Sequence, residues 1–257
     1  TAPSAPLPRT PAAPPVRPPV PALARPAAAD DEEVPLSRVR RLTAERLAQS
    51  AQQAPHFHLT RTVDADALLA FRAQANTDLD GTGVRVSVTD LLVKACAHAL
   101  AGHPEVNCSW AGDKLLRHRR VNVGLAVALE DGLVVPVIHD ADRKTLTEIS
   151  REARDLAERA RAGRLSLDEI TGGTFTISNL GMYGVDRFTA VINPPDAAIL
   201  AVGAARPTPV VRAGQVAVAT TMTLTLGIDH RVLDGATAAR FLGDLTALLE
   251  HPARVVL

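Results

Sequence analysis

Near its C-terminus the chain reads Asp229-His230-Arg231-Val232-Leu233-Asp234-Gly235. A run with strand-like alternation precedes this stretch, Val216–Ile228, and a run with helical spacing follows it, Ala236–Glu250. The stretch is therefore predicted to join a strand to a helix, where two scaffold elements can hold a site. His230 is the candidate proton acceptor, because histidine titrates nearest to neutral pH.

Asp234 and Gly235 extend this candidate site. Asp234 follows His230 by four positions, close enough to orient the imidazole or to brace the loop. Gly235 would allow a turn that is closed to other residue types. The same spacing also fits a surface pair at i and i+4, or an N-cap aspartate with a neighbouring histidine. The pattern alone leaves these alternatives open.

The first thirty of the 257 residues differ in composition from the rest. Residues 1–30 hold ten Pro and nine Ala, with too few large apolar side chains to offset the entropy of ordering. We expect residues 1–30 to be an extended, proline-stiffened linker that follows a further module upstream. Residues 31–257 have globular composition and suffice for one substantial core.

Composition also excludes several classes of partner and site. The formal net charge is zero, which argues against nucleic acid as the main partner, and no apolar run approaches the roughly 18 residues of a membrane span. The two cysteines and the histidines outside the motif lack metal-ligand spacing, so no metal is expected. Two buried thiols favour a reducing compartment, the cytoplasm of a bacterium or otherwise the mitochondrial matrix.

Hydrophobic patterns predict a mixed succession of elements. Helices are expected at residues 37–53, 65–78, 88–99, 145–162 and 236–250, the first three with N-caps at Ser37, Asp64 and Ser87. Strands are expected at residues 57–63, 106–110, 114–117, 121–129, 133–138, 174–178, 188–192, 197–204 and 216–228. Strict βαβ repetition is absent, so we expect one α+β domain with helices packed over a mixed sheet.

A second constellation lies where a strand meets a glycine-flanked turn, Gly172-Gly173-Thr174-Phe175-Thr176-Ile177-Ser178-Asn179-Leu180-Gly181. The Ser178 hydroxyl at the strand end could donate a hydrogen bond to a developing oxyanion. The alternative is a polar strand end that caps its own turn, which Ser-Asn before Gly often does. A serine nucleophile is not favoured, because the chain has no Gly-x-Ser-x-Gly elbow.

Residues 35–257 closely resemble the catalytic core of the dihydrolipoyl acyltransferases of 2-oxo acid dehydrogenase complexes. The matching segments are Ala54–Arg61, Val121–Val127, Gly132–Ile138, Gly173–Gly184, Ile192–Pro195 and Asp229–Gly235. The resemblance implies the chloramphenicol-acetyltransferase-like two-layer sandwich and a homotrimer with active sites between subunits. Coenzyme A would enter each site from one end and a dihydrolipoyl arm, carried on a separate upstream domain, from the other.

The resemblance also implies a role for each candidate residue. His230 matches the general base, and Ser178 matches the oxyanion donor, which the adjacent subunit would supply. Asp234 matches a carboxylate that braces the loop through an arginine, for which we suggest Arg61. Asn179 would position the turn.

The segments Gly181–Val185 and Phe188–Pro195 resemble the pyruvate-complex branch, which implies acetyl transfer. The alternatives are succinyl or branched-chain acyl transfer, a small-molecule acetyltransferase of the same fold, and a non-catalytic core scaffold. The implied partners are the decarboxylase and dihydrolipoyl dehydrogenase components around a cubic or icosahedral core. We expect the apolar C-terminal end, Val255-Val256-Leu257, either to join trimers or to fold back on its own subunit.

Overall fold

The computed structural model describes residues 30–255. The chain divides into two units, Thr1–Pro35 and Leu36–Leu257. In the first unit, the described residues 30–35 are exposed and form no helix or strand. The linker prediction for residues 1–30 thus falls almost entirely outside the described residues.

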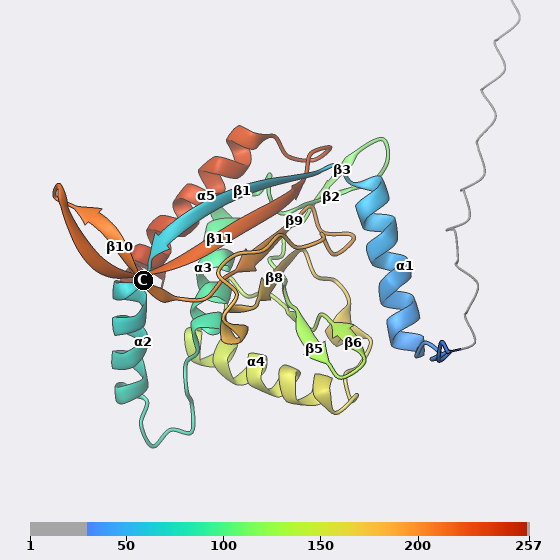
Figure 1. Ribbon diagram of the computed structural model, residues 1–257, viewed down its shortest axis with the longest axis horizontal. Coiled ribbons are helices and arrows are strands. Elements are labelled where there is room, and N and C mark those ends of the chain that lie inside the picture. Colours follow the sequence, from blue (N-terminus) through green and yellow to red (C-terminus); the bar gives the residue numbers. More distant parts are fainter. Residues whose placement is uncertain (1–29, 256–257) are drawn as a thin grey trace, which may run out of the picture. The chain divides into compact units, whose positions relative to one another are not determined.

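A mixed seven-stranded sheet forms the centre of the second unit (Figure 1). Its strands lie in the order β1 (His56–Asp64), β11 (Gln215–Asp229), β9 (Ala198–Val202), β8 (Phe175–Asn179), β4 (Val123–Leu125) and β7 (Val137–Ile138), and β10 (Arg206–Arg212) pairs with β11. The pairs β4–β8 and β8–β9 are parallel, and the other pairs are antiparallel. The predicted α+β class with a mixed sheet is confirmed.

Two small hairpins stand apart from the main sheet, β2 (Cys108–Trp110) with β3 (Leu115–Arg117) and β5 (Val127–Leu129) with β6 (Gly132–Val134). The second replaces part of the hairpin predicted for residues 121–138. The flanking segments β4 and β7 join the main sheet instead, because β4 finds a parallel partner in β8. The chain crosses from β4 to β5 at Ala126, whose N–H donates to the Ile177 carbonyl.

Five helices are described, α1 (Arg38–Gln53), α2 (Asp66–Asp78), α3 (Val88–Gly102), α4 (Leu146–Arg161) and α5 (Gly235–Glu250). Ser37 caps α1, and Ser87 and Asp90 form the predicted capping box of α3. Thr145 and Glu148 form a second capping box at α4. The prediction that Asp64 caps α2 is wrong, because Ala65 occupies the N-cap while Asp64 accepts a hydrogen bond from the Asp66 N–H.

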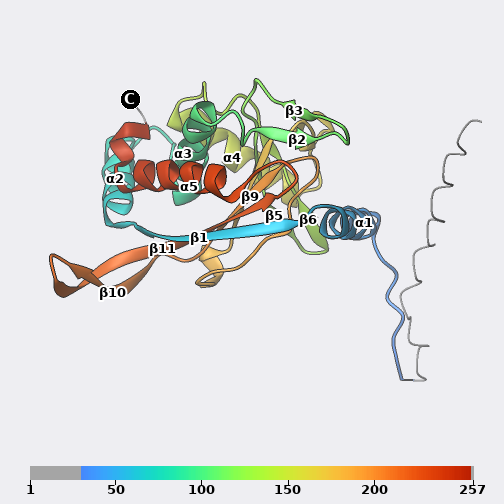
Figure 2. The same cartoon turned by 90° about the horizontal axis from the view of Figure 1, so that it is seen from above.

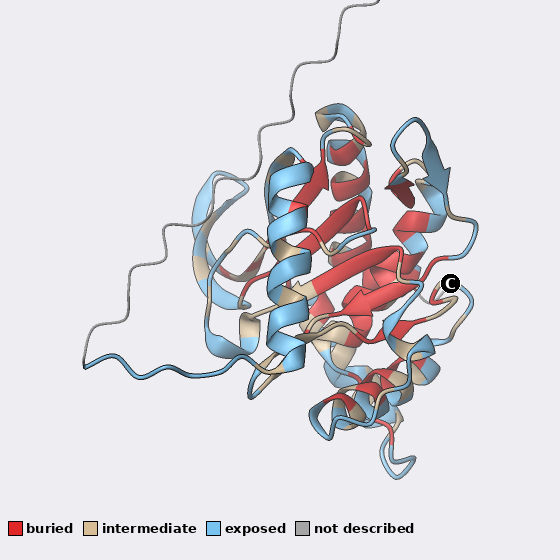
Figure 3. Ribbon diagram, turned by 90° about the vertical axis from the view of Figure 1, so that its right-hand side faces the viewer, coloured by how far each residue is buried: buried red, intermediate tan, exposed pale blue. Residues whose placement is uncertain are grey.

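The hydrophobic core lies between one face of the sheet and the helices α3 and α5, which form a second layer (Figure 2). Phe175 of β8 meets Phe241 of α5 edge-on, with ring centroids 5.8 Å apart. β9 is buried throughout, as predicted for a central strand. Figure 3 shows that buried residues gather on the strands at the centre of the unit. The helix α1 has one buried residue, Ser50, whose hydroxyl donates to the Ile192 carbonyl.

The strand predicted at residues 188–192 is wrong. Its backbone is engaged by side chains: the Ile192 N–H donates to the His56 ring, and the Ile192 carbonyl accepts from Ser50. The sequence analysis also missed β10, which contains Pro207 and Pro209. Proline is tolerated there because β10 is an edge strand that pairs with β11 alone.

The β10–β11 hairpin projects from the body of the unit (Figures 1 and 2). Val211, Val216 and Val218 are 74%, 80% and 72% exposed on it. Val211 pairs with Val216, and Val218 pairs with Pro209, so cross-strand neighbours give these residues one shared face. This exposed apolar face is called the valine ribbon below.

The C-terminal end differs in part from the expectation. A short 3-10 helix, η3 (Pro252–Val255), follows α5, and Val255 is buried in the core of its own subunit. Val255 therefore folds back on its own subunit, and the hypothesis that the C-terminal end joins trimers stays a prediction. Val256 and Leu257 lie outside the described residues.

Candidate active site

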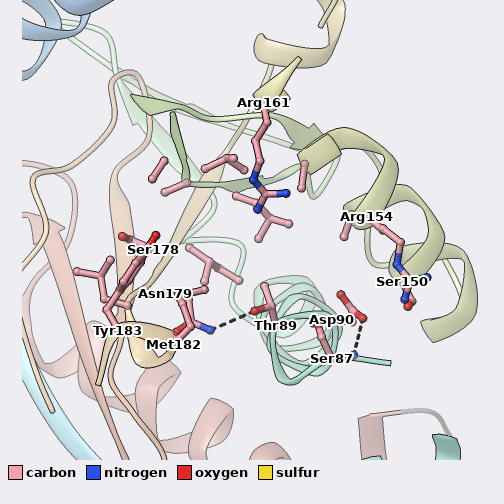
Figure 4. Close-up of a pocket in the computed structure, with 18 of the residues that line it drawn as sticks. Ser87, Thr89, Asp90, Ser150, Arg154, Arg161, Ser178, Asn179, Met182 and Tyr183 are labelled. Carbon is pink, nitrogen blue, oxygen red and sulfur yellow. Dashed lines mark hydrogen bonds between the residues drawn. The ribbon is translucent and has the colours of Figure 1, made fainter. Parts of the chain in front are cut away.

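Ser178 lies near the end of β8 and is half-buried. It pairs with Ala201 of β9, and its hydroxyl makes no hydrogen bond within residues 30–255. It lines a pocket of about 340 Å³ (Figure 4). The hydroxyl is thus free to donate to a molecule in this pocket.

Asn179 holds the turn that follows Ser178. Its Oδ1 accepts from the Gly181 N–H at 2.8 Å, and its Nδ2 donates to the Thr89 hydroxyl at 3.1 Å. Gly181 begins a short 3-10 helix, η2 (Gly181–Tyr183), and a Cβ there would lie 2.9 Å from the Gly203 carbonyl oxygen. Asn179 therefore has the turn-forming role that the sequence analysis expected, and the Ser178 hydroxyl takes no part in the turn.

Arginine side chains from outside the sheet contribute to the pocket wall. Arg154 and Arg161 come from α4 (Figure 4), and Arg85, which also lines the pocket, precedes α3. Ser87 and Thr89, from the start of α3, lie across from β8. The remaining wall is largely apolar. The pocket thus combines arginine side chains, an apolar wall and the Ser178 hydroxyl, a lining that suits a molecule with both negatively charged and apolar parts.

His230 immediately follows β11 and is exposed in the single chain. Its backbone N–H donates to the Pro55 carbonyl, and its ring meets the Phe57 ring edge-on, with ring centroids 5.2 Å apart. Its ring nitrogens make no hydrogen bond within the described part of the chain, so they are available to a substrate or to another chain.

An ion pair brackets His230. Arg231 donates to both carboxylate oxygens of Asp229, with Nη2 to Oδ2 at 2.6 Å and Nε to Oδ1 at 3.0 Å. Asp229 is buried, and it raises the pKa of the Arg231 guanidinium through hydrogen bonding. The guanidinium also lies 5.0 Å from the centre of the Trp110 ring. The sequence analysis missed the ion pair between Asp229 and Arg231, although an acidic and a basic residue on either side of His230 could have indicated it.

Asp234 is the N-cap of α5 and accepts from the Thr237 N–H at 2.7 Å. This hydrogen bond lowers the pKa of its carboxyl group. The suggested contact with Arg61 is absent from the described residues, and Arg61 lies beside Gly243 of α5 instead. Gly235 begins α5 without a positive φ, so the prediction of a glycine-only turn is wrong. The N-cap interpretation of Asp234 is thus the one that the geometry supports.

The structure does not bring Ser178 and His230 together within one chain. The strand register places Ser178 level with Ala201 and with Thr225 of β11. Asp229, which precedes His230, lies four residues further along β11, roughly 13 Å away at about 3.3 Å per residue. His230 is not among the residues that line the Ser178 pocket. A site that uses both side chains needs two chains.

Residues 30–255 contain no helix long and apolar enough to span a membrane. The same residues contain no group of three or more His, Cys, Asp or Glu side chains that could hold a metal ion. Cys96 and Cys108 are buried and unpaired, and burial raises the pKa of both thiols.

Comparison with known proteins identifies the family. Residues 28–257 match the model of the 2-oxoacid dehydrogenases acyltransferase catalytic domain. The chain is 45% identical over 231 residues to the mitochondrial dihydrolipoyllysine-residue acetyltransferase component of the pyruvate dehydrogenase complex of Schizosaccharomyces pombe, covering 89% of this chain and 48% of that protein. The chain spans about half the length of the curated relatives it matches.

Solved structures agree. The cubic core of the pyruvate dehydrogenase multienzyme complex matches with a TM-score of 0.88 at 38% identity, over 93% of this chain and all of that one. A structure of Azotobacter vinelandii dihydrolipoamide acetyltransferase also matches, with a TM-score of 0.86 at 38% identity, over 89% of this chain and 95% of that one. That structure was determined to examine the role of one serine, one histidine and one asparagine in the catalytic mechanism. Those three residues have the same spacing as Ser178, His230 and Asp234.

A chloramphenicol acetyltransferase matches with a TM-score of 0.53 at 15% identity, over 80% of this chain and 94% of that one, which shows a shared fold. The predicted fold class is thus confirmed, and the chain belongs to the family of 2-oxoacid dehydrogenase acyltransferase catalytic domains.

Proposed function

We propose that this chain transfers an acetyl group between coenzyme A and a dihydrolipoyl group carried on a separate domain, as the core of a pyruvate dehydrogenase complex. The observation that carries the proposal is the unengaged Ser178 hydroxyl in a pocket bordered by Arg85, Arg154 and Arg161. The arginines suit the phosphates of coenzyme A, and the apolar wall suits its pantetheine arm. Relatives with this activity at 41–45% identity add support.

The reaction is a thioester exchange. His230 takes the proton from the dihydrolipoyl thiol, and the sulfur attacks the carbonyl carbon of acetyl-coenzyme A. The carbonyl oxygen becomes negative and accepts a hydrogen bond from the Ser178 hydroxyl. Collapse of this intermediate breaks the bond to the coenzyme A sulfur, and that thiolate takes the proton from His230. The proton acceptor contributes about 10² to 10⁴ in rate, and one oxyanion donor about 10² to 10³.

The catalytic unit in this proposal is a homotrimer. Ser178 and His230 are too far apart within one chain, so each site combines Ser178 of one subunit with His230 of the next. The similarity to a cubic pyruvate dehydrogenase core favours further assembly of trimers. The decarboxylase and dihydrolipoyl dehydrogenase would be the other components. The compartment would be the bacterial cytoplasm or, as for the Schizosaccharomyces relative, the mitochondrion.

The test is a comparison of acyl donors on residues 31–257. Acetyl-, succinyl- and isobutyryl-coenzyme A are each offered with free dihydrolipoamide, and chloramphenicol serves as the small-molecule acceptor. The proposal expects acetyl-dihydrolipoamide to form with the highest kcat/KM. Preference for succinyl- or isobutyryl-coenzyme A would indicate a different 2-oxo acid dehydrogenase complex. Preference for chloramphenicol as acceptor would indicate a small-molecule acetyltransferase. No turnover with any pair would favour a non-catalytic scaffold.

A further inference from the structure

Asp196 is a buried carboxylic acid that has no cationic partner among residues 30–255. It precedes β9, and its Oδ2 accepts from the Thr176 hydroxyl at 2.6 Å. Its Oδ1 has no hydrogen-bond partner within the described residues. Burial raises the pKa of Asp196 to about 7, and the Thr176 hydrogen bond opposes that rise. Because an unpaired buried acid is costly, its presence points to a function.

Thr176 connects this acid to the candidate active site. It lies two residues before Ser178 on β8, so the two side chains project from the same face of the strand. The Thr176 hydroxyl donates a hydrogen bond to Asp196 Oδ2 and accepts one from Asn193 Nδ2 at 3.3 Å. Its orientation is therefore fixed, and with it the position of the strand relative to the segment from Asn193 to Asp196.

The same face of β8 is anchored at a second point. Thr174, which precedes β8, accepts from the Asn122 N–H at 3.1 Å and donates to the Asn122 carbonyl at 3.2 Å. Both hydroxyls that precede Ser178 on this face are thus buried and engaged. The Ser178 hydroxyl, the next in the series, is left without a partner and lines the pocket.

We propose that Asp196 is a positioning residue for acyl transfer, which holds the Thr176 hydroxyl and thereby fixes the Ser178 hydroxyl where the oxyanion develops. This inference rests on the proposed role of Ser178. A displacement of a reacting group by about 1 Å can lower the rate about a hundredfold. A hydrogen bond that fixes the strand two residues before Ser178 can therefore affect the rate of acyl transfer. Thr176 is the one side chain that contributes to the Asp196 pKa, and no charged group does.

The ionisation of Asp196 gives the inference a distinctive signature. An ionised Asp196 places a negative charge near the developing oxyanion and opposes its formation. Asp196→Asn keeps an oxygen that can accept from Thr176 but removes the charge. We expect the kcat of the wild type to decline as pH rises through about 7, whereas this variant should retain turnover at pH 6 and show no such decline.

The experiment measures kcat and KM for acetyl transfer from acetyl-coenzyme A to dihydrolipoamide between pH 6 and 9. Thr176→Val removes the link and should lower kcat about tenfold with KM within about twofold, whereas Thr176→Ser keeps the hydroxyl and should restore turnover. Thr246→Val removes a comparably buried hydroxyl, in α5, and should leave kcat unchanged. Circular dichroism and particle mass verify that each variant is folded and assembled.

A double-mutant cycle separates this inference from the proposed function. In a Ser178→Ala background, Thr176→Val should have little further effect, because no hydroxyl remains to be positioned. Equal losses in both backgrounds, or a wild-type pH profile for Asp196→Asn, would overturn the inference while leaving Ser178 its role. Near-wild-type turnover of Ser178→Ala alone would instead overturn the role of Ser178.

Discussion

Ser178 lies near the end of β8 and His230 follows β11, and these two strands run in opposite directions with β9 between them. The C-terminal ends of antiparallel strands point in opposite directions along the sheet, so folding one chain separates these side chains. If both side chains act in one site, as proposed above, association of chains is part of how that site forms.

Two inactive variants should therefore complement each other. Ser178→Ala and His230→Ala should each lower kcat by about 10² or more. When they are unfolded together at equal amounts and refolded, about a quarter of the sites receive Ser178 from one chain and His230 from the other. Turnover of the mixture should rise to about a quarter of the wild-type value, measured as acetyl transfer to dihydrolipoamide.

The control is the same mixture without the unfolding step, which should stay inactive if subunits do not exchange. A refolded mixture as inactive as its components would mean that both residues act from one chain. The double variant Ser178→Ala/His230→Ala, mixed with either single variant, should restore nothing.

Asp234 should act mainly as a helix cap. Asp234→Asn keeps an oxygen for the Thr237 N–H, so its thermal unfolding midpoint should stay near that of the wild type and its kcat within about threefold. Asp234→Ala removes the cap and should lower Tm by about 2–4 °C. Calorimetry and turnover of the three proteins decide this. If Asp234→Asn lost most activity at unchanged Tm, the carboxylate charge itself would be required.

The pocket arginines should govern affinity for coenzyme A. Arg154→Gln and Arg161→Gln should each raise KM for acetyl-coenzyme A about threefold to tenfold with kcat little changed, because a phosphate contact is lost in ground and transition states alike. The matched control is Arg151→Gln, which removes an exposed arginine of α4 that does not line the pocket. Equal effects at Arg151 and Arg161 would indicate general charge attraction rather than a phosphate site.

Asp196 should make stability depend on pH. Its pKa is about 7 in the folded chain and near 3.8 when unfolded, so the unfolded state loses its proton first as pH rises. The wild type should therefore lose stability relative to Asp196→Asn between about pH 4 and pH 7, with the difference constant above pH 7 and on the order of a few kcal/mol. Urea unfolding at pH 4.5, 6 and 8 measures it. A difference that does not change with pH would place the Asp196 pKa near its ordinary value.

The sequence predicted those parts of the fold that depend on local pattern. The capping box of Ser87 and Asp90 predicted the start of α3, and the strand-like alternation before Asp229 predicted β11. Both signals are local, because capping and periodicity depend on residues close together in the sequence. The predictions of secondary structure that were wrong concern segments whose conformation depends on residues distant in the sequence. β10 forms despite two prolines because β11 extends beyond the body and offers a partner. The segment at residues 188–192 is held by His56 and Ser50 instead of by another strand.

The candidate site was predictable to a similar degree. Ser178 and Asn179 stood out because glycines flank a polar strand end, and the structure places both at one pocket. The contact between Arg61 and Asp234 came from family resemblance, and the register instead directs Arg61 toward the middle of α5. Asp196 gave no signal, because burial of an acid next to Thr176 follows from tertiary packing and not from sequence spacing.

The valine ribbon bears on the order of events during biosynthesis. A newly folded single chain carries an apolar face on a strand pair with an open edge, the kind of surface on which chains associate indiscriminately. We therefore expect Val211, Val216 and Val218 to lower the solubility of the single subunit for as long as this face is uncovered. Charged substitutions on this ribbon would lengthen the lifetime of the monomer, and the yield of soluble protein would then report on folding separately from assembly.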